Sequence, residues 1–140
     1  MSKSIKIRKG LDIRIKGDAD RSSIEAPLSS TYAIKPTDFH GLIPKLLKKV
    51  GDQVKAGTPI FQDKYKESIK YVSPVSGKIQ EVKRGAKRKI LEVIIEADKE
   101  ISYEAGSPID VASLDREKAK EVLLSSGLWP FIKMRPIDVV

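Results

Sequence analysis

Few side chains in this sequence could perform acid–base, nucleophilic or metal chemistry. The chain has no cysteine and a single histidine, His40. The lack of cysteine excludes disulfides, thiol catalysis and iron–sulfur or cysteine-type zinc sites within the chain. His40 lies in a Phe-His-Gly sequence without paired carboxylates beside it. A lone histidine is more often structural than catalytic, although it can supply a proton near neutral pH. The sequence therefore shows no catalytic constellation.

Short strands and tight turns must position whatever chemistry the chain has. Apolar residues from Ile5 to Ile15 alternate with charged ones, which is the period of a half-buried strand. Thr31–Ile34 is predicted as a short strand that ends before Pro36. Further on, two predicted strands around Ile60 and Tyr71 flank a polar tip at residues 62–68. Glycines and prolines recur between these short β-branched runs, which is typical of a small barrel or sandwich.

The later part of the chain predicts one long strand and one helix. The run Ile90–Ile95 is almost wholly apolar and is predicted as a central strand buried on both sides. The basic segment Lys83–Lys89 before it is predicted as a turn, and Asp98–Pro108 after it as a polar loop. A helix follows, with Gly127 ending it. Its predicted N-cap is Ser113 or Asp115, and its predicted apolar face consists of Ala119, Val122 and Leu123.

The composition is that of a folded, basic protein. Of 140 residues, 40% are hydrophobic and 33% charged, which argues against disorder. No apolar run approaches the length needed to span a bilayer, and Met1–Lys16 lacks the apolar core of a signal peptide. The net charge of +8 favours acidic partners or simply a well-solvated surface. Only 6% of residues are aromatic and no reading helix is visible, so nucleic-acid binding is disfavoured.

One pair of segments resembles the lipoyl and biotinyl carrier domains. The segments are Val50–Ile60, which contains Gly51, Gly57 and Pro59, and Ser73–Ile79, which contains Pro74 and Gly77. Gly51 and Gly57 suit turns that a Cβ would disfavour, and the prolines fix φ at strand entries. Gly77 is predicted to let the chain bend tightly from one sheet into the second. Carrier domains place their modified lysine at a hairpin tip, which corresponds to Lys66 here, with Lys64 two residues away. The surrounding residues match neither acceptor motif, so the resemblance implies the fold and favours unmodified, solvated lysines.

The whole chain resembles the A subunits of the sodium-translocating NADH:quinone reductases. Several blocks carry this resemblance in the same order: Ile7–Ile13, Pro36–Leu47, Gly57–Lys64, Arg84–Ile90 and Ser126–Pro130. It implies a mainly β barrel-sandwich hybrid with one C-terminal helix and the start of a truncated, Rossmann-like α/β second domain. The expected division is residues 1–34 for strands and a loop associated with the barrel, 35–97 for the barrel core and 98–140 for the rest. The chain is thus interpreted as an N-terminal fragment.

The resemblance also implies a function. The family's complex oxidises NADH, reduces ubiquinone and exports sodium, with flavins and an iron–sulfur centre carried by other subunits. The A subunit would be a peripheral partner of those subunits on the cytoplasmic face of the bacterial inner membrane. We expect no cofactor bound to this chain and no catalysis by the chain alone.

A quinone site needs an apolar slot for the ring and one or two polar groups for its carbonyls. The segments Tyr32–His40 and Trp129–Arg135 both have this chemistry. The residues expected near quinone are Phe39, His40, Trp129, Phe131, Met134 and Arg135. The family pattern often has proline where His40 stands, which weakens a required role for the histidine. The structural alternative is that Trp129 and Phe131 pack against the second domain.

Three alternative functions follow from the same features. An Rnf-type electron-transport subunit would share the barrel, but its family carries cysteine-rich motifs further along the chain. A biotin or lipoyl carrier would show a covalent mass increment at Lys64 or Lys66. A basic nucleic-acid-binding barrel would bind DNA or RNA with a steep salt dependence.

Overall fold

Two antiparallel sheets form the body of the molecule. The computed structural model describes residues 16–17, 20–106, 109–134, 136–138 and 140, so the strand pattern predicted for residues 5–15 lies outside the described residues. One sheet has the order β1-β7-β6-β3 and the other β2-β4-β5. The strands are β1 (Thr31–Ile34), β2 (Pro44–Leu46), β3 (Gln53–Val54), β4 (Pro59–Asp63), β5 (Lys70–Val72), β6 (Gly77–Arg84) and β7 (Ile90–Ala97).

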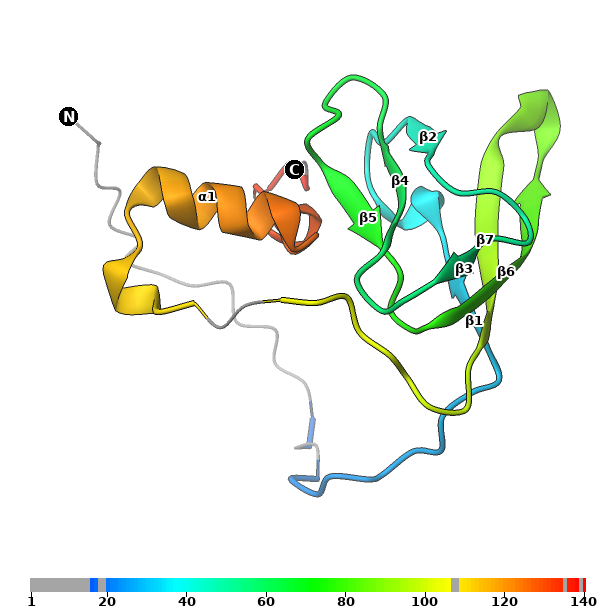
Figure 1. The fold of residues 1–140 in the computed structure, drawn as a ribbon, viewed down its shortest axis with the longest axis horizontal. Helices are drawn as coiled ribbons and strands as arrows, with labels where there is room; N and C mark the ends of the chain where they lie inside the picture. The colour runs from blue at the N-terminus through cyan, green and yellow to red at the C-terminus, as the bar shows by residue number, and fades with distance from the viewer. Residues whose placement is uncertain (1–15, 18–19, 107–108, 135, 139) are drawn as a thin grey trace.

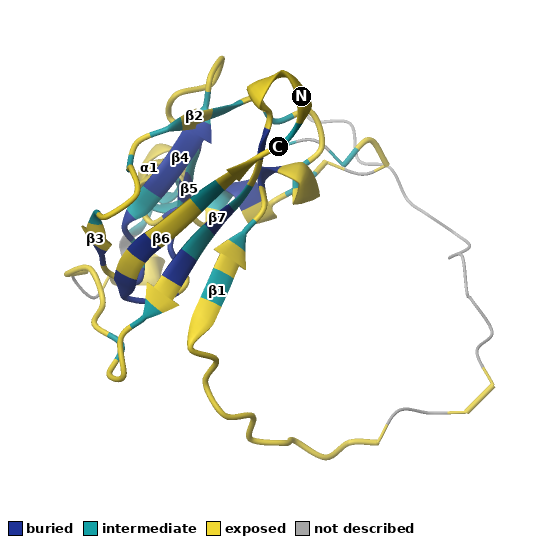
Figure 2. Ribbon diagram, turned by 90° about the vertical axis from the view of Figure 1, so that its right-hand side faces the viewer, coloured by how far each residue is buried: buried dark blue, intermediate teal, exposed yellow. Residues whose placement is uncertain are grey.

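The core lies between the facing sides of the two sheets (Figure 2). Ile60 and Phe61 of β4 and Ile79 of β6 are fully buried, as are Val93 and Ile95 of β7. β-branched residues fit a pleated, half-buried surface well, which is why these segments form strands. The mainly β barrel-sandwich fold predicted from the sequence is confirmed.

The central strand β7 differs from its prediction in one respect. It lies between β1 and β6, as a central strand should, but only one of its faces is buried. Leu91 is 38% exposed and Glu92 is half-buried, whereas Val93 and Ile95 are inside. The expectation of burial on both sides was wrong because Leu91 and Ile94 lie on the outer face, which the described part of the chain leaves uncovered.

The turn glycines have the backbone angles predicted for them. Gly51 and Gly57 have φ of +94° and +98°, a region that L-residues with a Cβ enter at a cost. Gly77 is required for another reason, since an added Cβ would lie 1.9 Å from the backbone oxygen of Glu96 on β7. The predicted role of Gly77 was a bend between sheets, whereas its position in the structure serves a close approach of β6 to β7.

The segment after β7 is tied to the barrel by hydrogen bonds. The backbone of Ala56 accepts from Glu104 N at 2.8 Å and donates to Ser102 O at 2.9 Å. The buried Ser76 hydroxyl accepts from Ser102 N at 2.9 Å, and the Thr58 hydroxyl donates to the Glu104 carboxylate. These contacts hold the start of the polar loop against the barrel.

The helix α1 (Arg116–Ser125) begins and ends as predicted (Figure 1). The side chain of Asp115 accepts from Lys118 N at 2.8 Å, so Asp115 is the N-cap. Gly127 follows the helix with φ +73°, in the left-handed conformation usual at this position. The predicted apolar residues Ala119, Val122 and Leu123 are half-buried, and so is Leu124, which sequence reasoning missed and which packs against the core cluster.

Short 3-10 helices complete the described structure: η1 (Pro36–Asp38), η2 (Ala86–Arg88), η3 (Val111–Ser113) and η4 (Trp129–Phe131). The last of these lies against β5 and the end of α1. It carries the C-terminal segment back onto the barrel, where Pro130 is fully buried.

Substituting Gly77→Ala tests the close approach of β6 to β7. The added methyl would overlap the Glu96 carbonyl, so we expect the free energy of unfolding to fall by about 3 kcal/mol. Urea denaturation measures it. Gly106→Ala is the matched control, because a Cβ there has no atom within 4 Å and should change stability by less than about 0.5 kcal/mol. Equal stability of the two variants would contradict this account of Gly77.

Candidate functional site

A column of aromatic rings runs from the barrel core to the surface. Phe61 of β4 stacks on Tyr71 of β5 with ring centroids 5.0 Å apart. Phe39, in the loop after η1, meets Tyr71 edge-on at 4.5 Å, and Phe131 of η4 meets Phe39 edge-on at 6.2 Å. Phe61 and Tyr71 are buried, whereas Phe131 is 66% exposed. We call these four rings the aromatic column; its outer ring, Phe131, is exposed to solvent.

Local backbone geometry turns Phe39 into the column. Pro36 is buried and starts η1, and Phe39 N donates to Pro36 O at 3.3 Å. Leu42 N then donates to Phe39 O at 3.3 Å, and Gly41 takes φ +72°. The proline and glycine thus fold the chain tightly on both sides of the ring.

A cation lies over Phe39, the third ring of the aromatic column. The Nζ atom of Lys133 is 5.8 Å from the centre of the Phe39 ring and 3.0 Å from Oδ2 of Asp138. A positive charge over a ring face is attracted by the ring quadrupole. The combination offers a flat apolar surface with a hydrogen-bond donor at its edge, which suits a planar ring bearing carbonyl groups.

Tyr71 contributes a protonated hydroxyl. Burial, with a smaller effect of the Asp63 carboxylate, raises the pKa of Tyr71 to about 12. Because both effects disfavour the phenolate, the hydroxyl keeps its proton at neutral pH and can act as a donor.

His40 lies at the rim of two hollows on the surface. One, of about 380 Å³, is bounded by the loop from Pro36 to Pro44, by Lys89 and by Ile90 at the start of β7. The other, of about 190 Å³, lies between His40, the β4–β5 turn and Tyr71. The first is large enough for a small ligand, since ligand cavities start at roughly 300 Å³. His40 itself is exposed.

The structure brings together only some of the residues predicted near quinone. Phe39 and Phe131 are in contact, although they come from distant parts of the sequence. Trp129 is half-buried and packs against the barrel core. Its packing on a second domain stays a prediction. Met134 is 59% exposed. Arg135 lies outside the described residues.

Sequence reasoning missed Tyr71 as a member of this cluster. Ile69 and Tyr71 alternate with the half-buried Lys70, so the strand period placed Tyr71 on the inner face. That signal predicts burial but not that the ring lies directly beneath Phe39.

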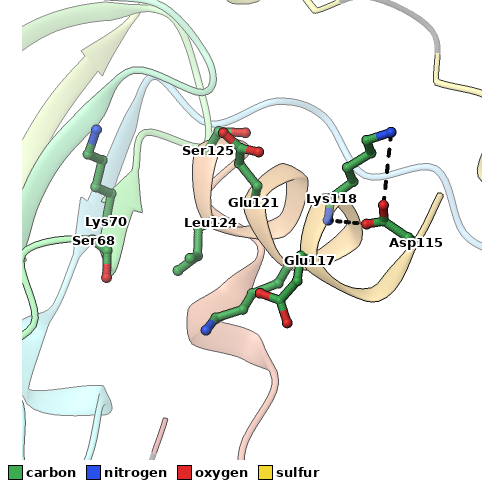
Figure 3. A pocket seen from close by; sticks show the side chains of 9 residues that line it. Ser68, Lys70, Asp115, Glu117, Lys118, Glu121, Leu124 and Ser125 are labelled. Carbon is green, nitrogen blue, oxygen red and sulfur yellow. Dashed lines mark hydrogen bonds and ion pairs between the residues drawn. The ribbon is translucent and has the colours of Figure 1, made fainter.

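A groove between α1 and β5 is a third hollow on the surface (Figure 3). Its volume is about 670 Å³, and Ser68 and Lys70 lie across it from Glu117, Glu121 and Leu124. The 3.9 Å pair of Lys118 with Asp115 lies on the side of the helix away from β5. Charges of both signs line the groove without a nucleophile next to a base, so it offers no evident reaction chemistry.

The two tip lysines lie in the turn between β4 and β5, as the carrier resemblance implied. Lys66 Nζ donates to the backbone oxygen of Val140 at 2.8 Å, and Lys64 Nζ is 5.7 Å from the Tyr65 ring centre. Nearby, Lys45 of β2 pairs with Glu67 at 2.6 Å, and this hydrogen bond and charge lower the pKa of Glu67.

Two kinds of feature are missing from the described part of the chain. No group of three or more histidine, cysteine or acidic residues there could hold a metal ion. None of the helices described is long and apolar enough to cross a membrane.

The chain is similar to curated proteins from several bacteria. It is 37% identical over 138 residues to the A subunit of the Na(+)-translocating NADH-quinone reductase of Saccharophagus degradans, a match that covers 97% of this chain. It is 38% identical over 137 residues to the protein of the same name from Marinomonas sp., covering 96%. The Vibrio vulnificus protein is 37% identical over 138 residues, covering 97%. The chain spans 31% of the length of each of these relatives.

The same relationship appears at the level of the domain. The family model for the NqrA N-terminal barrel-sandwich hybrid domain matches residues 5–98. These residues include all the strands described above. The family expected from the sequence is therefore confirmed, and this chain belongs to the family of the NqrA N-terminal barrel-sandwich hybrid domain.

Proposed function

We propose that this chain is the barrel part of the A subunit of a sodium-pumping respiratory complex that oxidises NADH and reduces ubiquinone. The relatives that bear the name of this subunit support the assignment. The family match also favours it over an Rnf-type subunit, a carrier domain or a nucleic-acid-binding barrel.

Within the complex, the chain would provide docking surface at the cytoplasmic face of the inner membrane. Its partners would be the other subunits, which would carry the flavins and the iron–sulfur centre. The domain division at residues 34 and 97 is part of the same proposal. The end of the family match at residue 98 and the position of α1 beyond it support the boundary at residue 97. The match runs across residue 34, and β1 pairs with β7, so residues up to 34 would belong with the barrel.

The aromatic column is our proposed contribution to the quinone site. The single observation that carries it is the contact of Phe39 with Phe131 beside Lys133. The exposed edge of Phe131 can stack on a quinone ring, and the Lys133 ammonium can donate to a quinone carbonyl. His40 directly follows Phe39 and is exposed to solvent. We include it in the proposed site because quinone reduction consumes protons and an imidazole is a common proton donor in enzymes.

Binding of a short-chain ubiquinone to the chain tests this role. Trp129 is the only tryptophan, so quenching of its fluorescence reports binding near η4. We expect saturable quenching, with Phe131→Ala weakening the affinity about fivefold through loss of one aromatic contact. Tyr103→Ala is the control, because Tyr103 is 72% exposed on a different part of the surface. Quenching that is equally strong in both variants would contradict the proposed site.

Affinity purification tests membership of the complex. The full-length tagged protein is captured from solubilised native membranes, and the accompanying proteins are identified by mass spectrometry. We expect integral membrane subunits that carry flavin. An untagged strain treated in the same way is the control. Recovery of a carboxylase or a soluble dehydrogenase, or of no membrane protein, would refute the assignment and leave the barrel fold standing.

A further inference from the structure

The hairpin of β6 and β7 projects beyond the rest of the barrel and ends in a basic tip (Figure 1). Arg84, Lys87, Arg88 and Lys89 are all exposed there. Gly85 N donates to Lys89 O at 2.8 Å, and Arg84 Nη1 donates to Arg88 O at 3.3 Å. The tip is therefore a hydrogen-bonded turn that displays four exposed cations.

Two of these cations occupy backbone conformations that are unfavourable for residues with a side chain. Lys87 and Arg88 have φ of 54° and 59°, in the left-handed region that favours asparagine and glycine at the centre of a hairpin turn. A lysine–arginine pair strains the turn, whereas asparagine–glycine would relieve it. Strain of this kind often marks residues kept for what their side chains do.

A second loop adds charge and apolar surface next to the tip. Lys48, Lys49 and Val50 follow β2 and bound a hollow of about 720 Å³ together with Arg84. Leu47 is 41% exposed and Val50 is 56% exposed. We call this surface the basic patch; it consists of Leu47, Lys48, Lys49, Val50, Arg84, Lys87, Arg88, Lys89 and Leu91.

Most acidic side chains close to the basic patch form hydrogen bonds or ion pairs within the chain. The Asp52 carboxylate accepts from the backbone N of Lys49 at 3.0 Å. Glu92 pairs with Lys83 at 3.1 Å and with Lys35 at 3.6 Å, and Lys83 chiefly lowers the pKa of Glu92. Glu81 is the remaining acid on this part of β6. The basic patch thus keeps an excess of positive charge.

The side chains of the basic patch suit an anionic lipid bilayer better than a nucleic acid. Nucleic-acid-binding surfaces add aromatic rings on which bases stack, and the patch contains none. It instead has aliphatic side chains among long basic ones. At a bilayer, leucine and valine enter the headgroup region while ammonium and guanidinium groups reach the lipid phosphates.

We propose that the basic patch docks on an anionic lipid bilayer. Leu47 and Val50 would enter the interface, and the cations of the β6–β7 tip would contact headgroup phosphates. This inference rests on the patch alone and stands apart from the quinone site.

Flotation of the 140-residue chain with lipid vesicles tests the proposal. Vesicles of phosphatidylcholine with phosphatidylglycerol should bind the chain, and pure phosphatidylcholine vesicles should not. The double variant Lys87→Asn with Arg88→Gly should bind about 25-fold more weakly, as two cations are lost at the surface. The same variant should unfold at higher urea concentration, because its turn is relaxed. Weaker binding with higher stability separates loss of docking from loss of folding.

Two further variants decide the interpretation. Lys55→Asn with Lys99→Asn removes two exposed cations near the opposite end of the sheet and should leave binding within about twofold of the parent. Val50→Ser keeps every charge and should weaken binding about threefold by removing aliphatic contact. Equal losses of vesicle affinity in the two double variants would mean that net charge alone determines binding, and this would overturn the proposal. Unchanged binding by Val50→Ser would overturn it too, pointing to a purely charged partner such as an acidic protein.

Discussion

The contact between Phe39 and Tyr71, with ring centroids 4.5 Å apart, links the separate parts of this molecule. Tyr71 and Phe61 belong to the smaller sheet and are buried in the core. Phe39 comes from the loop that joins β1, in the larger sheet, to β2, and Phe131 from the segment after the helix. Edge-to-face and stacked rings favour particular geometries, so the column fixes how the C-terminal segment lies on the barrel. The candidate site exists because that segment is held there.

Local chemistry in the sequence predicted much of the fold. Gly51, Gly57 and Gly127 all adopt the positive φ that their positions indicated, and Asp115 caps the helix. These features depend on a few neighbouring residues, which is why sequence reasoning finds them. The exposure of Leu91 on β7 was not predictable in that way, because it depends on whether another layer covers the outer face of the sheet. The convergence of Phe39 and Phe131 was likewise hidden, since only the path of the folded chain brings them together.

The aromatic column and the basic patch are neighbours on one barrel. Lys89 belongs to the basic patch and also bounds the hollow beside Phe39 and His40. If the patch docks on a bilayer and the column binds quinone, this hollow lies close to the lipid from which a quinone would come. The larger groove beside α1 has mixed charges and faces a different part of the chain. The aromatic column and the basic patch thus consist of different residues, and their positions are compatible with binding quinone and lipid together.

The central claim is that Phe39 and Phe131 interact to form one site from two segments. A double-mutant cycle with Phe39→Leu and Phe131→Leu measures that interaction directly through urea unfolding. We predict a coupling energy of about 1 kcal/mol, as for an aromatic pair. The pair Phe39→Leu and Tyr103→Leu should instead be additive within about 0.3 kcal/mol. Additivity of the Phe39 and Phe131 substitutions would contradict the account, because the C-terminal segment would then not depend on the aromatic column.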